Sequence, residues 1–292
     1  MSDEQNESKY LLPVDDGLPM RASGEWAEKK LDILSHYITT STTAMAKRPW
    51  RSRVYIDLQA GPGKNRIDKS GRVVLGSPLL ALTQGAGYTD YRFVEQDPVL
   101  ADALRMRASA TGRVTPQSII VGDCNETVDA IVREIQERDA KYLPGKWQSL
   151  CLVFLDPEGL ELHWRTVSLL ANVLRADFVI NFSTGGLRRV AGEAFQHPES
   201  SVADRVNQFF GTEDWRDIPV RLDGSMPVNE WIDFYQSRLN EIGYKWGTES
   251  SIKIKTEYGV ELYRLLFASK HDLGVKLWEE ARKNAPKQRS MF

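Results

Sequence analysis

The chain has 292 residues, of which 41% are hydrophobic and 27% charged, with a net charge of −2 and a pI near 6.2. That is enough apolar material for a large packed core, and the near balance of charge excludes a global field that attracts nucleic acid or anionic membrane. The two cysteines, Cys124 and Cys151, lie well apart, each in or beside a predicted strand, which favours reduced core thiols over a disulfide framework or a zinc site and indicates a cytoplasmic location.

The N-terminal stretch 1–23 is polar and acidic, without the basic start and apolar run of a signal peptide. We predict a flexible arm here, because few apolar groups are present to offset the entropy of ordering it. Apolar runs long enough to span a bilayer are also missing, so we expect no membrane partner. A single domain is expected over 24–292.

An apolar stripe at helical spacing opens this domain, formed by Trp26, Ile33, Leu34, Tyr37 and Ile38. Apolar strands then alternate with helices, and we predict the strands at 53–58, 91–95, 118–121, 150–155 and 178–182. This rhythm predicts an α/β fold with a doubly wound, mostly parallel, Rossmann-like sheet.

The segments between these strands contain residues that are typical of helix N-termini. Ser77-Pro78 and Asp97-Pro98 each place a capping side chain before proline, Asn125 is a third candidate cap, and a fourth helix is predicted at 166–174. After the fifth strand we predict a helical insertion at about 183–245, whose last helix occupies 228–242. A C-terminal β-hairpin over 251–255 and 260–269 and a helix over 273–282 complete the fold, before a basic tail.

Polar residues follow each of the five strands. Because ligands of open α/β sheets bind beyond the carboxyl ends of the strands, we expect these side chains to meet at one rim, although an acid there can simply cap the next helix. They are Asp57 with the Gly61-Pro62-Gly63 loop, Glu95, Asp123, Asp156-Pro157 and Asn181.

The glycine loop permits close approach of a ligand to the backbone. It does not continue as a nicotinamide-binding fingerprint, because Arg66 stands where a third glycine is required. It is no Walker loop either, since Gly63-Lys64 is followed by Asn65 instead of Ser or Thr. A nucleotide-dependent oxidoreductase therefore remains only as a third alternative.

The stretch D-L-Q-A-G-P-G from Asp57 resembles motif I of class I methyltransferases that use S-adenosylmethionine. The resemblance implies that Gly61 and Gly63 pack against the cofactor, and that Glu95 in FVEQD holds its ribose hydroxyls. Asp123 in VGDCN matches the acid that accepts from the adenine amino group. The predicted cofactor site comprises these residues and two neighbours, and its full membership is Asp57, Gly61, Gly63, Glu95, Gln96, Asp123 and Cys124.

The fourth strand end, LVFLDPEGL, resembles the Asp-Pro pair that amino-group methyltransferases place beside the target nitrogen. It implies that Asp156 and Pro157 orient the acceptor, with His163 as a second candidate base; the alternative for His163 is a structural role. The Pro-Tyr that usually follows is replaced by Glu158-Gly159, so a local stacking aromatic is missing. The alternatives for Trp164 are that it supplies this stacking surface or that it belongs to the hydrophobic core.

Residues 25–292 as a whole resemble the three-Cys-motif partner proteins, a family with a methyltransferase-like domain. The segments that carry this include YIDLQAGPGKN, GSPLLAL, FVEQDP, GDCNE, FLDPEGLELHW and LYRLLFASKHDLGVKLW, together with the Trp26 helix. The resemblance implies a partner protein with a three-cysteine, radical-SAM-like motif. It leaves open whether the chain methylates an amine or other nucleophile on a nucleic acid, nucleotide or small metabolite, or is a catalytically silent binding subunit.

The segment between Gly63 and Ser77 is predicted as an extended loop, and it is rich in cations: Lys64, Arg66, Lys69 and Arg72. These cations either form a solvated face or meet substrate phosphates at the rim, in which case Arg188 and Arg189 extend the patch.

Overall fold

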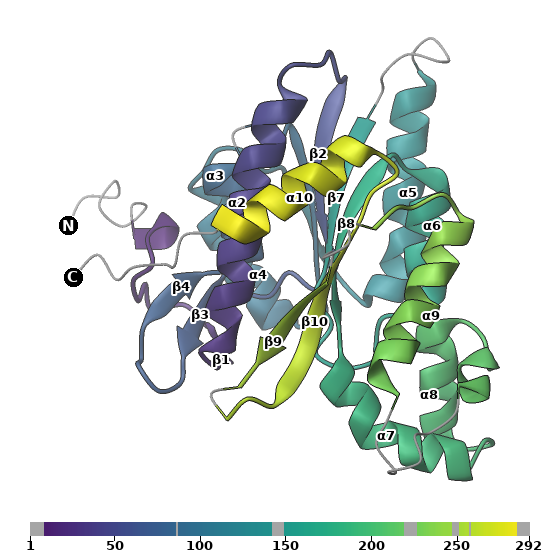
Figure 1. Ribbon diagram of the computed structural model, residues 1–292. Coiled ribbons are helices and arrows are strands. Elements are labelled where there is room, and N and C mark those ends of the chain that lie inside the picture. The colour runs from purple at the N-terminus through teal and green to yellow at the C-terminus, as the bar shows by residue number, and fades with distance from the viewer. Residues whose placement is uncertain are drawn as a thin grey trace.

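A seven-stranded sheet forms the centre of the computed structural model, which describes residues 9–85, 87–141, 149–218, 227–246, 251–256 and 258–284 (Figure 1). In spatial order its strands are β6 (Ile119–Val121), β5 (Asp90–Glu95), β2 (Ser52–Asp57), β7 (Ser149–Leu155), β8 (Ala176–Phe182), β10 (Glu261–Ala268) and β9 (Ser251–Lys255). The first five strands in this order, β6, β5, β2, β7 and β8, are parallel, whereas β10 runs antiparallel to both β8 and β9.

The central strands carry long apolar runs, because helices cover both faces of the sheet. Neighbouring residues such as Val153 and Phe154 are both fully buried, and they enter different hydrophobic cores on opposite faces. One core includes α2 (Trp26–Met45), α3 (Ser77–Gln84), α4 (Pro98–Ser109) and α10 (Asp272–Asn284). The other includes α5 (Cys124–Ala140), α6 (Trp164–Val173), α7 (Thr184–Gln196), α8 (Ser201–Phe210) and α9 (Val228–Glu241).

This arrangement confirms the predicted fold class, a doubly wound, mostly parallel, Rossmann-like α/β fold. The predicted C-terminal hairpin is β9 and β10, and the predicted helical insertion contains α7, α8 and α9 (Figure 1). The segment 219–226 of this insertion and the basic tail 285–292 lie outside the described residues. Cys124 and Cys151 are both free and buried.

The segment 64–75 folds as two antiparallel strands, β3 (Lys64–Ile67) and β4 (Val73–Leu75), so the prediction of an extended loop is wrong. A third strand, β1 (Arg21–Ser23), pairs in parallel with β3 and completes a separate small sheet.

The prediction of a flexible arm is also wrong for residues 9–23. Asp16 is fully buried between Lys64 and Arg107, at 2.7 Å and 2.6 Å from their side-chain nitrogens. Burial raises the pKa of this carboxyl, but hydrogen bonds from the two cations prevail and lower it to about 2. Charge pairing therefore fixes a segment that has few apolar residues to bury.

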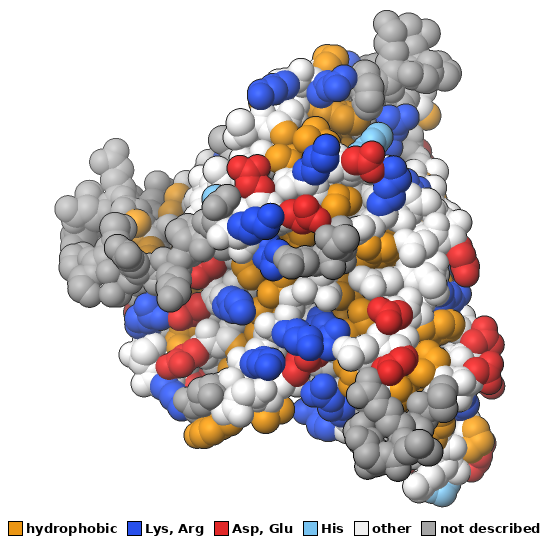
Figure 2. Space-filling view, in the orientation of Figure 1, with side chains coloured by type: hydrophobic (Ala, Val, Ile, Leu, Met, Phe, Trp, Pro, Cys, Tyr) orange, Lys and Arg blue, Asp and Glu red, His pale blue; other side chains and the backbone are white. Residues whose placement is uncertain are grey.

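Helices α2 and α10 lie together across one face of the sheet (Figure 1). Phe267 of β10 stacks on Trp278 of α10 with ring centroids 4.9 Å apart, and Tyr37 of α2 meets both rings edge-on. On the face shown in Figure 2, basic and acidic side chains are interspersed, as the small net charge leads one to expect. Among the helices of the described ranges, none combines the length and apolar character that a bilayer crossing requires.

Candidate functional site

Two adjoining cavities open at the edge where the parallel strands end. The larger has a volume of about 300 Å³ and the smaller about 160 Å³. Arg21, Gln59, Asp156 and Glu158 line both of them, so one ligand can contact both spaces. Together they fall at the lower end of the range of about 300–1,000 Å³ that small-molecule sites occupy.

The smaller cavity gathers the predicted residues at the ends of β5 and β6. Glu95, Gln96, Asp123 and Cys124 all line it. Two carboxylates and an amide thus face one small space, which suits a ligand rich in hydroxyl and amino donors.

Glu95 also shapes the glycine loop. One of its carboxylate oxygens accepts a hydrogen bond from the Gly61 amide at 2.8 Å, and the other accepts from the Asp97 amide at 2.9 Å. Gly61 has a φ of +65° and Gly63 a φ of +87°, the left-handed region that favours glycine. A Cβ added at Gly63 would lie 3.0–3.1 Å from Leu104 and Leu79, so this glycine is also needed for packing.

Asp57 lies beneath the loop and lines neither cavity, contrary to its predicted role as a cofactor contact. It is fully buried, and it accepts a hydrogen bond from the Gln59 amide at 3.3 Å. Burial raises the pKa of Asp57 to about 7, against hydrogen bonds from Ser77 and the Gln59 amide that lower it. Ser77 is the first residue of α3 and not its cap, a position that Gly76 occupies.

Asp123 and Cys124 begin α5. Asp123, not Asn125 as predicted, is the N-cap of this helix, since its carboxylate accepts from the Asn125 amide at 2.6 Å. Burial raises the pKa of the Cys124 thiol to about 12, so the thiol stays neutral. Its sulfur accepts a hydrogen bond from the Gln59 side-chain amide at 3.2 Å.

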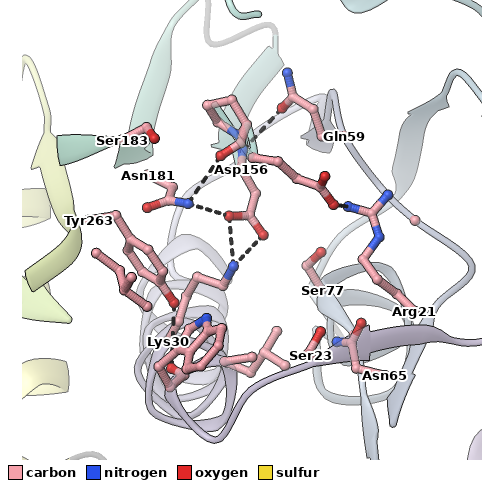
Figure 3. Close-up of a pocket in the computed structure, with 18 of the residues that line it drawn as sticks. Arg21, Ser23, Lys30, Gln59, Asn65, Ser77, Asp156, Asn181, Ser183 and Tyr263 are labelled. Carbon is pink, nitrogen blue, oxygen red and sulfur yellow. Dashed lines mark hydrogen bonds and ion pairs between the residues drawn. The ribbon is translucent and has the colours of Figure 1, made fainter. Parts of the chain in front are cut away.

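The larger cavity is built around Asp156, at the end of β7 (Figure 3). Lys30 Nζ of α2 lies 2.7 Å from one carboxylate oxygen and 2.5 Å from the other. Asn181, at the end of β8, donates to the same carboxylate at 2.8 Å and to the Pro157 carbonyl at 3.3 Å. The backbone amide of Asp156 donates to the Gln59 side chain at 3.0 Å. Lys30 of α2 and Asn181 of β8 therefore fix the carboxylate, and Gln59 fixes the backbone of the same residue.

Lys30 was not predicted as a site residue. A usable signal was its place on the apolar stripe of α2, three and four residues before the buried Ile33 and Leu34. A lysine on a buried stripe requires a partner, and here the partner is 126 residues away in sequence.

His163 and Trp164 do not line either cavity, so the structure gives no support to a role for His163 as a base. His163 is the N-cap residue of α6, and Trp164 is 7% exposed and packs edge-on against Tyr235. The aromatic walls of the larger cavity come instead from Trp26 and Tyr263, which are distant in sequence from Asp156.

Three of the four cations of the predicted loop form ion pairs. Lys64 is buried against Asp16, Arg66 pairs with Asp15, and Arg72 pairs with Glu28. These three contacts argue against the alternative in which the cations meet substrate phosphates.

The two arginines beyond the fifth strand, Arg188 and Arg189, differ in their contacts. Arg188 donates to the Glu261 carbonyl at 2.9 Å. Arg189, which is exposed, lines the larger cavity and has no ion-pair partner within the described residues. The neighbouring α7 carries Gly185 and Gly186 in its first turn, where both border the same cavity.

Arg21 of β1 lines both cavities, and Figure 3 shows its side chain in the larger one. Its guanidinium lies 2.6 Å from Glu158 and 3.6 Å from Glu95. A Cβ added at Gly61 would lie 3.7 Å from Arg21 Nε. The small sheet thus places a cation over the glycine loop, which composition alone did not reveal.

Comparison with known proteins gives only distant likenesses. Neither a family model nor a curated protein matches the chain. Among solved structures, protein LPL1258 from Legionella pneumophila is 10% identical with a TM-score of 0.44, covering 88% of this chain and 92% of its own. A Klebsiella pneumoniae protein provisionally described as an O-methyltransferase is 12% identical with a TM-score of 0.43, covering 91% and 87%. Cofactor-bound Rv0187 from MTB is 15% identical with a TM-score of 0.38, covering 92% and 88%. At these scores the likenesses say nothing about the chemistry of this chain.

Proposed function

We propose that the chain binds S-adenosylmethionine across the two cavities and transfers its methyl group to a nucleophile in the larger one. The observation that carries the proposal is that both cavities share Gln59, Asp156 and Glu158. In a ligand that lies across both cavities, one end contacts Glu95 and is recognised there. The other end lies at Asp156, where the methyl group is transferred. The sequence resemblance to motif I supports the same cofactor.

The residues present fit this cofactor. Glu95, Gln96 and Asp123 line the smaller cavity. In this proposal Glu95 holds the ribose hydroxyls, and Asp123 with Gln96 holds the adenine edge. Gly61 offers the larger cavity a wall without a side chain. When bound, the cofactor supplies a methyl group on a positively charged sulfonium. The carboxylates of Asp156 and Glu158 suit that positive charge, and the contribution of the chain is mainly alignment.

Calorimetry with S-adenosylmethionine tests the proposal. We expect saturable binding by the wild type, and affinity about 10–100-fold weaker in Glu95→Gln, because one charge-assisted hydrogen bond is worth about 1.5–3 kcal/mol. Asp102→Asn on the outer face of α4, where the side chain is 71% exposed, is the matched control and should bind like the wild type. Absence of binding by a folded wild type, or equal affinity in Glu95→Gln, contradicts the proposal.

The second candidate is a methyltransferase-shaped binding subunit that does not turn over. Two observations favour it: Lys30 and Asn181 already satisfy the carboxylate of Asp156, and Arg21, which lines both cavities, is paired with Glu158. In this case the chain acts with a three-Cys-motif, radical-SAM-like protein or presents a nucleic acid or nucleotide to it. Co-expression with that protein and purification through a tag on it tests the candidate. A stable complex that needs no Asp156 supports it, whereas methyl transfer by the isolated chain contradicts it.

A further inference from the structure

The acceptors that an amine substrate needs are already occupied in the larger cavity. Both oxygens of Asp156 accept from Lys30, and one also accepts from Asn181. The Pro157 carbonyl, the other acceptor of an amine-binding Asp-Pro pair, accepts from Asn181 as well. A neutral amine would have to displace a charged donor from this carboxylate, although charged donors form the stronger hydrogen bonds.

The same cavity offers donors instead. Lys30 has three N–H groups, and Asp156 accepts from it through two oxygens, which leaves one N–H for a ligand. Arg189 is exposed at the cavity and has no acidic partner within the described ranges. The charged residues lining the cavity are Arg21, Lys30 and Arg189 against Asp156 and Glu158, an excess of one positive charge. Such a cavity attracts an anion.

The walls favour an aromatic body on that anion. Trp26 lines the cavity with 37% of its surface exposed, and a Cβ added at Gly24 would lie 1.9 Å from its ring, so the indole is seated against the backbone. Tyr263 lines it too, with its ring centroid 5.3 Å from Lys30 Nζ. Planar rings stack on such surfaces.

We propose that the methyl acceptor is an aromatic carboxylate, and that Lys30 is the residue that selects it over an amine. This inference rests on the proposed function. The carboxylate oxygen donates an electron pair to the methyl carbon, a C–O bond forms as the C–S bond breaks, and the C–S electron pair stays on sulfur. The acceptor leaves as a neutral methyl ester, and no proton has to be removed. Asp156 can therefore remain paired with Lys30, whose position it fixes.

Binding of matched probes tests the inference. Phenylacetate and 2-phenylethylamine share a ring and differ in the sign of their charge, and each is titrated into the protein by ligand-detected NMR. We expect the acid to bind at least about tenfold more tightly than the amine, and Lys30→Met to abolish this preference, since it removes a charged donor. Lys29→Met, an exposed neighbour on the same helix that does not line the cavity, is the control and should keep it.

Asp156→Asn changes the binding affinity in opposite directions for the two kinds of acceptor. If the acceptor is a carboxylate, this variant binds phenylacetate several-fold more tightly, because Lys30 is released from its partner. If the acceptor is an amine, the variant loses affinity for the amine. Should Asp156→Asn not fold, Lys30→Met and Lys29→Met still decide the question.

Preference for the amine, unchanged acid binding in Lys30→Met, or no binding of either probe overturns the inference. N-acetylphenylalanine and its amide form a second pair that repeats the test of charge. Comparison of N-acetylphenylalanine with phenylacetate shows whether the acid is the carboxyl end of a peptide or a free small molecule. Calorimetry with S-adenosylmethionine on the same preparations separates the two proposals. Cofactor binding without acid preference sinks this inference alone, and acid preference without cofactor binding sinks the proposed function.

Discussion

The buried carboxyl of Asp57 makes the stability of the fold depend on pH. Its pKa is raised from an ordinary 3.8 to about 7, mainly by burial. Between pH 4 and pH 7 the native state therefore binds more protons here than the unfolded state, and the free energy of unfolding falls as the pH rises. We predict that Asp57→Asn removes this dependence, because the amide keeps an oxygen for the Gln59 amide and carries no charge.

The magnitude follows from the size of the shift. A difference of about three pKa units at 1.36 kcal/mol each costs the folded wild type about 4 kcal/mol once the group is fully ionised. Part of that cost is already present at pH 5, so the interval from pH 5 to pH 8 contains about 2–3 kcal/mol of it.

Urea unfolding of the wild type and Asp57→Asn at pH 5 and pH 8 measures the effect. The variant should gain about 2–3 kcal/mol relative to the wild type between the two pH values. Asp102→Asn, which removes an exposed carboxylate, should show no such gain. If the stability difference between wild type and Asp57→Asn is the same at both pH values, the carboxyl of Asp57 does not titrate near neutrality and the reasoning is refuted.

Two further predictions concern the small sheet and the glycine loop. Asp16→Asn should lower the free energy of unfolding by about 3–5 kcal/mol, because it leaves two buried cations without their counter-charge. In the same urea titration the exposed Asp15→Asn should cost less than about 1 kcal/mol, and equal losses would show that burial does not matter here. Gly63→Ala should lower the melting temperature through about 1–3 kcal/mol of strain and crowding. Gly71→Ala shares the positive φ but has open space around it, so a larger loss there would contradict the crowding argument.

Much of the fold could be predicted from local pattern. Buried parallel strands have to be apolar on both faces, and β2, β5, β7 and β8 each carry such a run, so their predicted bounds lie within one or two residues of the observed ones. The segment 64–75 was missed because β3 and β4 are short and β3 carries the cations Lys64 and Arg66. Its strand character depends on pairing with β1, which is 40 or more residues away in sequence.

The candidate site likewise contains residues that the sequence pattern could locate and residues that it could not. The strand-end residues Glu95, Asp123 and Asp156 could be located, because topology brings the carboxyl ends of parallel strands to one edge. Arg21 and Lys30 reach that edge from segments that precede the first strand of the large sheet, so their partners are set by tertiary packing and not by a local pattern. Asp57 is the residue that the motif led us to expect, but it is buried and lines neither cavity. A motif specifies the residue type and not its exposure.

The contact between α2 and α10 has a consequence for biosynthesis. Helix α2 leaves the ribosome well before α10, and the aromatic rings of Tyr37, Phe267 and Trp278 meet only when both have emerged. At a translation rate of about 5–20 residues per second, the apolar side of α2 waits roughly 10–50 s for this cover. During that interval it is a ready target for a chaperone, and premature termination anywhere before β10 leaves a product whose central sheet is incomplete.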